Sequence, residues 1–380
     1  MKVLMISGYI PSAGGGGIER HVYDLSMGLI NRGVDVAIAC ENRQYFSGNY
    51  DLIRDRLVLS GVNGRLPHSL QLIDKSFVLS RSFDPSEYDV IHCHAQYGMA
   101  SVLKNRLRRG KKPITITTLH GTTAGVFNSL KKHGIGSRIP MPGTVTSMAM
   151  EGLSSRLSDA CIAVSNNVAR EAHGYYRVKK GRIKVIYNWV DNERFRPYDR
   201  IEARKKLGLD SQGLYLLYTG RTDKIKGYHL VVDAMKALGD RATLLVASKG
   251  AGEMGEKDAG NIKLLGYVED RLLPLYYSAC DLFAFPSIYE GLPLTLIEAI
   301  SCGAVPVCMN LPPMDEVVDA SNGYLCEKFD PGEYTRALMS AIESPDRNLR
   351  SAECIRRSGI FRMERAIEET AGLYESLLKA

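Results

Sequence analysis

Residues 285–299 read FPSIYEGLPLTLIEA and are the most informative stretch of this sequence. They continue an apolar run, Leu282–Phe285, that is typical of a buried strand, and they end in a helical pattern. Two carboxylates, Glu290 and Glu298, lie eight residues apart, the first in the turn and the second inside the helix. Gly291 lets the backbone approach a ligand closely, and the N–H groups of the helix's first turn suit a diphosphate. The stretch therefore predicts a strand, a ligand-binding turn and a helix; a surface helix with two ordinary glutamates is the alternative.

The same rhythm of short β-branched runs and amphipathic helical patterns extends along the whole chain, which favours parallel α/β layers. The strands expected in the first half are Lys2–Ser7, Val34–Cys40, Val90–His92, Ile114–Leu119, Cys161–Val164 and Ile183–Ile186. Those expected in the second half are Leu214–Thr219, Thr243–Ala247, Ile262–Leu264, Leu282–Phe285, Val305–Val307 and Gly323–Leu325. Because the series restarts, we predict two similar domains rather than one large sheet.

The break between the two domains is expected near Asn188–Pro197, a polar segment whose proline precedes a helix over Arg200–Leu207. This gives an N-terminal domain of residues 1–195 and a C-terminal domain of residues 196–362. The last helix, within 363–380, has an apolar stripe to bury and could pack on either domain. A chain of 380 residues suits two domains of ordinary size.

A glycine run, Gly14–Gly17, separates the first expected strand from a helix over Ile18–Asn31. A strand, a glycine loop and a helix present N–H groups and the positive helix end to a phosphate. The run lacks G-x-G-x-x-G spacing, and only Glu41 stands near the usual place of an acidic ribose partner, which argues against a nicotinamide-dependent oxidoreductase. A flexible loop without a ligand is the alternative.

A second strand end carries the segment Gly220–Gly227, GRTDKIKG. Arg221 and Lys226 are bracketed by the two glycines, which predicts that both cations converge on one anion. Solvated surface cations are the alternative.

Three histidines stand at or near strand ends. His120 closes the strand Ile114–Leu119, at the edge where open α/β sheets bind ligands. His92 and His94 share one face of a strand, which invites a metal interpretation. No cysteine or carboxylate stands at ligand spacing from them, and the sequence has no Asp-x-Asp pair to hold a metal on a nucleotide sugar. We therefore predict no metal site.

The net charge of +7 is unevenly distributed. Residues 1–195 carry 26 Lys and Arg against 15 Asp and Glu, whereas the remainder carries 23 against 27. No acidic residue lies between Asp89 and Glu151. A field of one sign attracts an anionic membrane, a phosphorylated lipid or nucleic acid; a solvated basic face is the alternative.

The composition, 45% hydrophobic and 24% charged, is that of a globular protein, and no apolar run is long enough to span a membrane. We interpret MKVLMIS as the first strand rather than as a signal peptide. The eight cysteines are scattered without a C-x-x-C pair, which predicts neither disulfides nor a thiolate metal site. We expect a cytoplasmic protein, and leave open a peripheral attachment to the inner membrane face.

Four motifs in this order resemble the retaining GT-B glycosyltransferases of family four, and the resemblance covers nearly the whole chain. The motifs are GGGGIERHVYDLSMGLINRGVDV at 14–36, NWVD at 188–191, GRTDKIKG at 220–227 and EGLPLTLIEAISCGAVPV at 290–307. The chain departs from the family pattern at Trp189, where glycine is usual, and in the segments 247–252 and 310–316 near the expected donor.

The resemblance implies an α/β protein of the GT-B fold, with two Rossmann-like domains whose parallel sheets face each other across a cleft. It implies retaining transfer of a hexose or N-acetylhexosamine from a nucleotide diphosphate sugar to a glycan or lipid-linked acceptor, as in cell-envelope polysaccharide or glycolipid synthesis. A UDP-sugar is favoured as donor and GDP-mannose comes next. No metal, other cofactor or nucleic acid is expected. The alternatives are a GT-B nucleotide-sugar epimerase and a non-catalytic module that binds a nucleotide sugar or an anionic membrane.

The resemblance also implies residue roles. Arg221 and Lys226 would neutralise the donor diphosphate, Glu290 would bind the donor sugar and Glu298 the ribose. His120 would lie beside the donor sugar and complete a catalytic set with Arg221, Lys226 and Glu290. No carboxylate nucleophile is expected, because the leaving phosphate assists a front-face attack. The donor-binding set is Gly16, Gly17, Gly220, Arg221, Lys226, Tyr267, Val268, Glu290, Gly291, Leu292, Pro293, Leu294, Thr295 and Glu298. The acceptor-side set is His21, His120, Thr122, Lys131, Lys132 and Arg138.

Overall fold

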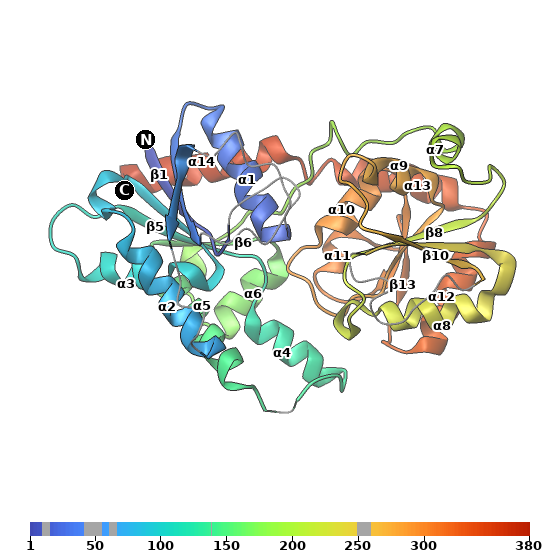
Figure 1. Cartoon of the computed structure of the whole chain (residues 1–380), viewed down its shortest axis with the longest axis horizontal. Helices are drawn as coiled ribbons and strands as arrows, with labels where there is room; N and C mark the ends of the chain where they lie inside the picture. Colours follow the sequence, from blue (N-terminus) through green and yellow to red (C-terminus); the bar gives the residue numbers. More distant parts are fainter. Residues whose placement is uncertain (10–15, 42–54, 61–66, 138, 249–259) are drawn as a thin grey trace. The chain divides into compact units, whose positions relative to one another are not determined.

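A computed structural model describes residues 1–9, 16–41, 55–60, 67–137, 139–248 and 260–380 of the chain. The chain folds into two compact units. The first unit comprises Met1–Asn128, Ser137–Asn188 and Glu364–Ala380, and the second comprises Ser129–Gly136 and Trp189–Met363. Each unit is a twisted parallel sheet covered by helices on both faces (Figure 1).

The first unit contains a seven-stranded parallel sheet in the order β3-β2-β1-β4-β5-β6-β7. Its strands are β1 (Lys2–Ile6), β2 (Asp35–Glu41), β3 (Leu57–Ser60), β4 (Val90–His94), β5 (Ile114–Leu119), β6 (Ala160–Ala163) and β7 (Ile183–Val185). Every strand expected in this half is confirmed within a residue or two at its ends. The sequence did not predict β3, a short strand at the edge of the sheet that pairs only with β2 among the described strands.

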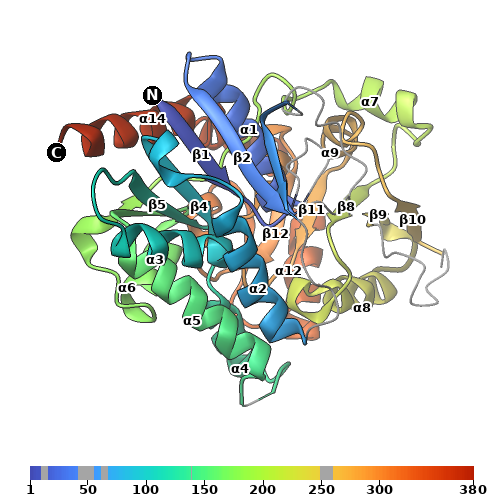
Figure 2. The same cartoon turned by 60° about the vertical axis from the view of Figure 1, so that its left-hand side comes forward.

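The central strands β1 and β4 are buried on both faces, as near-continuous apolar runs predict for a parallel sheet. The helices α2 (His68–Arg81), α3 (Met99–Leu107) and α5 (Pro142–Leu157) cover one face, and α1 (Gly17–Ile30) and α14 (Met363–Lys379) cover the other (Figure 2). The remaining helices of this half of the chain are α4 (Thr123–Lys132) and α6 (Asn166–Gly174).

The second unit repeats the plan with a six-stranded parallel sheet in the order β10-β9-β8-β11-β12-β13. Its strands are β8 (Tyr215–Thr219), β9 (Thr243–Ala247), β10 (Ile262–Gly266), β11 (Leu282–Phe285), β12 (Val305–Met309) and β13 (Tyr324–Cys326), which confirms all six expected strands. One face carries α8 (Tyr228–Leu238) and α12 (Pro331–Glu343). The helices α7 (Arg200–Leu207), α9 (Leu273–Ala279), α10 (Leu294–Ser301) and α13 (Arg347–Ser358) cover the other, and α11 (Met314–Val317) is a single turn after β12.

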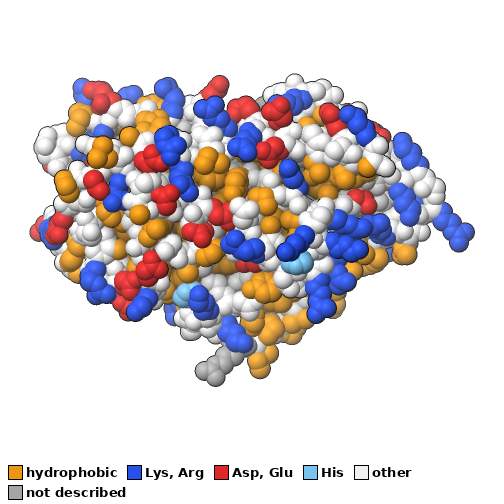
Figure 3. All heavy atoms as spheres, turned by 180° about the vertical axis from the view of Figure 1, so that it is seen from behind, with side chains coloured by type: hydrophobic (Ala, Val, Ile, Leu, Met, Phe, Trp, Pro, Cys, Tyr) orange, Lys and Arg blue, Asp and Glu red, His pale blue; other side chains and the backbone are white. Residues whose placement is uncertain are grey.

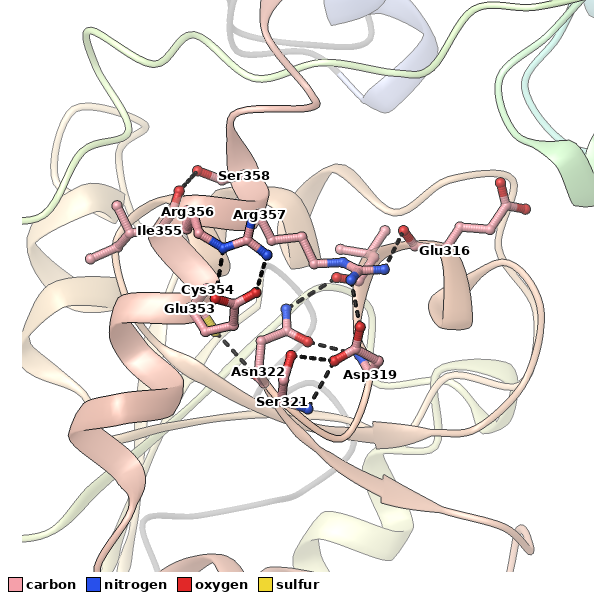
Figure 4. Close-up of polar contacts among 11 residues, drawn as sticks. Glu316, Asp319, Ser321, Asn322, Glu353, Cys354, Ile355, Arg356, Arg357 and Ser358 are labelled. Atoms are coloured by element: carbon pink, nitrogen blue, oxygen red, sulfur yellow. Dashed lines mark hydrogen bonds and ion pairs between the residues drawn. The ribbon is translucent and has the colours of Figure 1, made fainter.

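Arg357 ties the end of α13 to the chain between α11 and β13 (Figure 4). Its guanidinium contacts the Asp319 carboxylate at 2.5 Å and donates to the Glu316 carbonyl oxygen at 3.3 Å. The Asp319 carboxylate also accepts from the Ser321 backbone N–H at 2.8 Å. These bonds hold residues 316–321 in place. This segment directly follows residues 310–316, where the sequence departs from the family pattern.

The unit boundaries differ from the sequence-based domains in three places. The change of unit comes after Asn188, slightly before the expected residue 195. The last helix packs with the first unit, where Ile367 lies against Gly28 of α1. The short segment Ser129–Gly136 belongs to the second unit instead of the first, because its Ser129 hydroxyl donates to the Ile288 carbonyl oxygen at 2.9 Å.

Both sheets contain a point at which the direction of strand order reverses. In the first sheet it lies between β1 and β4, and in the second between β8 and β11. The loops that leave the carboxyl ends of two such strands depart to opposite sides and leave room for a ligand between them. The fold therefore marks the loops after these four strands as the candidate site in each unit.

All eight cysteines are buried free thiols, which agrees with the predicted lack of disulfides. None of the helices among the described residues is both long and apolar enough to cross a membrane.

The packing of α1 against α14 predicts a requirement for glycine at position 28. A Cβ atom there would lie 2.0 Å from Cδ1 and 2.8 Å from Cγ1 of the buried Ile367 side chain. We expect Gly28→Ala to lower the free energy of unfolding by about 1–3 kcal/mol through overpacking. The matched control is Gly372→Ala on α14, where nothing lies within 4 Å of the added atom and where alanine should stabilise the helix by about 0.5–1 kcal/mol. Thermal unfolding of the full chain measures both; equal stabilisation by the two variants would contradict the packing.

Candidate active site

In the second unit, the loops after β8 and β11 are joined by backbone and side-chain hydrogen bonds. The Ile288 N–H donates to the Ile225 carbonyl oxygen at 3.0 Å, and the Ser287 hydroxyl donates to the same oxygen at 3.3 Å. Gly227 has φ +70°, and a Cβ atom there would lie 2.4 Å from the Pro286 carbonyl oxygen. Only glycine fits both the backbone conformation and this approach. The GRTDKIKG segment and the segment that carries Glu290 are therefore built as one surface.

Lys226 and Glu290 form an ion pair at this surface. Lys226 Nζ lies 2.6 Å from Glu290 Oε1, and the two side chains are 24% and 12% exposed. Arg221 is 73% exposed and pairs instead with Asp223, at 3.0 Å. In this structure each cation has its own carboxylate partner, and the convergence of both cations on one anion stays a prediction.

Glu298 lies inside α10 and is buried, as expected for the second carboxylate of the motif. It accepts a hydrogen bond from the Tyr277 hydroxyl at 3.0 Å. Burial raises the pKa of Tyr277, so this tyrosine stays a neutral donor. No side chain caps the N-terminus of α10, which leaves the positive helix end available to an anion.

In the first unit, three histidines gather at the carboxyl ends of β4 and β5. We call His21, His94 and His120 the histidine cluster; one ring nitrogen from each lies within 4.8 Å of the others. His94 Nδ1 and His120 Nε2 are 3.0 Å apart, and His21 Nδ1 lies 3.2 Å from Asn188 Oδ1. His92 stacks on His94 with ring centroids 4.5 Å apart.

All four rings are held neutral by burial. Desolvation lowers the pKa of His92 and of His120 to about 3, and it lowers the pKa of His21 and of His94 well below the ordinary value. Neighbouring imidazoles add to the effect on His21, His92 and His94, since two charged rings at this distance would repel. The cluster can therefore donate and accept hydrogen bonds, or bind a metal, without first losing a proton.

Two family models match adjoining parts of the chain. The description Glycosyltransferase Family 4 matches residues 15–194, and Glycosyl transferases group 1 matches residues 199–357. The chain belongs to the family 4, group 1 glycosyltransferases. A D-inositol 3-phosphate glycosyltransferase of Geodermatophilus obscurus is 28% identical over 311 residues, 77% of this chain and 67% of that protein.

Solved glycosyltransferase structures have the same fold over almost all of their length. The sucrose-phosphate synthase of Thermosynechococcus elongatus superposes with a TM-score of 0.83 at 20% identity, covering 100% of this chain and 99% of that one. HepE of Anabaena, in complex with UDP and glucose, superposes with a TM-score of 0.74 at 18% identity, covering 99% and 100%. The protein is thus a glycosyltransferase of the GT-B type with two Rossmann-like domains.

The structure brings most of the expected donor-binding residues of the second unit to the loops after β8 and β11. Gly291, Leu292 and Pro293 form a buried turn, and Leu294 and Thr295 open α10. Tyr267 and Val268 instead follow β10, the edge strand of the sheet, and Tyr267 is 48% exposed.

The expected residues at the start of α1 and on the acceptor side are more scattered. Gly16 precedes α1 as its N-cap and Gly17 begins it, with no side-chain cap. Thr122 is buried and donates to Glu171 Oε2 at 2.6 Å, while its oxygen accepts from the Gly125 N–H at 2.9 Å and thus caps α4. Lys131 and Lys132 are exposed and lie in the second unit. Arg138, Gly14 and Gly15 lie outside the described residues.

Sequence reasoning did not predict the partners that hold these groups. The sequence analysis considered His94 only together with His92, although β4 ends in His94 and His120 directly follows the adjacent strand β5, which was a usable signal. The register partner of His94 on β5 is Thr118, two residues before His120. Tyr374, 282 residues from His92, lies 2.6 Å from its Nδ1, and no local pattern indicates a contact across that separation.

The buried histidines predict a specific pH dependence of stability. Because His120 titrates near pH 3 when folded and near 6.5 when unfolded, the unfolded chain binds a proton that the folded protein does not. The unfolding free energy should therefore fall as the pH drops from about 6.5 towards 3. In His120→Gln this slope should be shallower by about 1.4 kcal/mol per pH unit. Denaturant unfolding between about pH 4 and 6 measures it, and an unchanged slope in His120→Gln would contradict the assignment.

Proposed function

We propose that this glycosyltransferase transfers a hexose or N-acetylhexosamine from a nucleotide diphosphate sugar, with retention of the anomeric configuration and without a metal ion. A UDP-sugar is the favoured donor and GDP-mannose the next. The acceptor is a phosphorylated or lipid-linked molecule or a glycan. The observation that carries this proposal is the Lys226–Glu290 pair on the joined loops after β8 and β11.

The ion pairs of the second unit support binding of a diphosphate. Lys226 and Arg221 each hold a carboxylate that the donor can replace: the diphosphate would take the place of Glu290 beside Lys226 and of Asp223 beside Arg221. Glu290, released from the lysine, could then accept hydrogen bonds from the sugar hydroxyls. The two cations and the uncapped end of α10 would supply the charge that a metal supplies in other transferases. Removing one such group should lower the rate by about 10²–10³.

The proposed chemistry needs no carboxylate nucleophile. The bond from the anomeric carbon to the diphosphate oxygen breaks, and the acceptor oxygen forms its bond on the same face. The acceptor's proton passes to the leaving phosphate oxygen, so charge and protons balance within the two substrates. His120, neutral at its strand end, is proposed to hydrogen-bond the donor sugar.

The named relatives support the choice of substrates. HepE has been solved with UDP and glucose, which favours a UDP-sugar for this chain. Several curated relatives are D-inositol 3-phosphate glycosyltransferases, so a phosphorylated acceptor is supported as well.

We also propose that attachment to an anionic membrane uses exposed apolar residues in addition to the basic stretch. Three cations of that stretch have acidic partners nearby: Arg106 with Asp159 at 3.3 Å, Arg108 with Asp84 at 3.2 Å and Lys111 with Asp89 at 3.8 Å. The exposed apolar side chains Ile139, Met141 and Val145 stand at the start of α5 and just before it. Figure 3 shows hydrophobic side chains reaching the surface between Lys and Arg side chains.

Donor binding should depend on Lys226. In buffer that contains a chelator, UDP at about 100 times its Kd should stabilise the wild type by about 2.7 kcal/mol, and this response should be lost in Lys226→Ala. The matched control is Lys224→Ala, an exposed lysine of the same loop, which should respond like the wild type. A thermal-shift panel of UDP, GDP, ADP and their sugars measures the effect. Stabilisation by no nucleotide, or only with added metal, would contradict the proposal.

Membrane attachment should depend on the apolar residues before α5. The wild-type protein should float with vesicles rich in anionic lipid. The double variant Ile139→Ser and Met141→Ser should not float with them, because it lacks two apolar anchors. Leu349→Ser is the control, because Leu349 is 76% exposed like Ile139 but lies on α13. Equal flotation of all three proteins, or none with the wild type, would contradict this attachment.

A further inference from the structure

The histidine cluster has a geometry that the transfer reaction does not require. One nitrogen from each of His21, His94 and His120 lies within 4.8 Å of the other two, and the described residues offer no carboxylate or thiolate to this group. His21 and His94 are buried, whereas His120 is only partly buried, so the cluster can be reached from the His120 side. Three imidazoles are a ligand set that zinc uses with water as the fourth ligand.

A second observation points to a missing ligand. His94 is fully buried, and its Nε2 has no hydrogen-bond partner. Its other nitrogen, Nδ1, lies 3.0 Å from His120 Nε2. A buried polar atom without a partner destabilises the folded protein, so a group that binds His94 Nε2 would remove that penalty.

The surroundings also orient the rings as they do in metal sites. His21 Nδ1 faces the Asn188 side-chain oxygen at 3.2 Å, so this nitrogen carries the proton and Nε2 keeps its lone pair. His92, which stacks on His94, is fixed at both nitrogens by Tyr374 and Thr118, each at 2.6 Å. These bonds limit rotation of the His21 ring and of the His92 ring, on which His94 stacks.

We propose that His21, His94 and His120 form a binding site for a zinc ion, with a water molecule as the fourth ligand. Zinc and neighbouring transition metals prefer imidazole nitrogen, whereas magnesium and calcium prefer oxygen ligands, which this cluster lacks.

The rings must draw together to bind the ion, because nitrogens bonded to tetrahedral zinc at about 2.0–2.1 Å lie about 3.3 Å apart, whereas those of the cluster lie within 4.8 Å of one another.

Zinc binding would regulate the proposed reaction negatively. An ion on His120 would occupy the side chain that we assign to the donor sugar. Zinc should therefore inhibit transfer, while chelators should leave the rate unchanged. This consequence rests on the proposed function; the binding of zinc does not.

Metal binding can be measured without any activity. Untagged protein, stripped with a chelator, should bind one Zn²⁺ in competition with a chromophoric indicator. Co²⁺ in its place should show the intense visible absorption of a four-coordinate ion. His94→Gln and His21→Gln should weaken Zn²⁺ binding by at least about 100-fold, and Asn188→Ala, which frees the His21 ring, by about 10–100-fold.

His173→Gln, on the exposed side of α6, should bind like the wild type, and Mg²⁺ should not compete. Far-UV circular dichroism and metal-free thermal unfolding establish whether each variant is folded. If a histidine variant does not fold, Asn188→Ala still tests the site, because it keeps all three ligands. Absence of saturable Zn²⁺ or Co²⁺ binding to the wild type, which would leave an ordered water as the occupant, would overturn the proposal. Equal binding by wild type, His94→Gln and His21→Gln would overturn it as well.

Discussion

The parallel arrangement of the strands is the constraint on which the rest of the structure depends. All strands of a parallel sheet end at the same edge, and at a reversal of strand order the two neighbouring loops separate. In the second sheet this places the GRTDKIKG loop after β8 and the Glu290 turn after β11. In the first sheet it places α1 after β1 and His94 at the end of β4. Each unit thus builds its functional groups from segments that are distant in sequence.

The two units arrange their polar groups by different physical means. The second unit keeps its charges paired and partly exposed, as in Lys226–Glu290 and Arg221–Asp223, so that an anion can exchange with a carboxylate at small desolvation cost. The first unit buries neutral imidazoles, whose pKa values are lowered by desolvation. The paired charges of the second unit suit a diphosphate. The neutral imidazoles of the first unit suit hydrogen bonds to an uncharged sugar or coordination of a metal.

Local patterns predicted the larger part of the fold and the identity of the donor-site motifs. β-branched runs predicted twelve of the thirteen strands, because burial on both faces requires continuous apolar segments. β3 was missed although its sequence, LVLS, is itself a short apolar run. Contacts between distant segments could not be predicted from pattern alone. Examples are the Tyr374–His92 hydrogen bond and the Lys226–Glu290 ion pair; both depend on side-chain packing that motif spacing does not encode.

The most direct test of the account is the configuration of the sugar that the protein releases. Slow hydrolysis, with water in place of the acceptor, can be followed by NMR with ¹³C-labelled UDP-glucose, UDP-N-acetylglucosamine and GDP-mannose in the presence of a chelator. The account predicts that one UDP-sugar is consumed and that its sugar first appears as the α-anomer, before mutarotation. First appearance of the β-anomer, or no consumption of any nucleotide sugar without added metal, would contradict it.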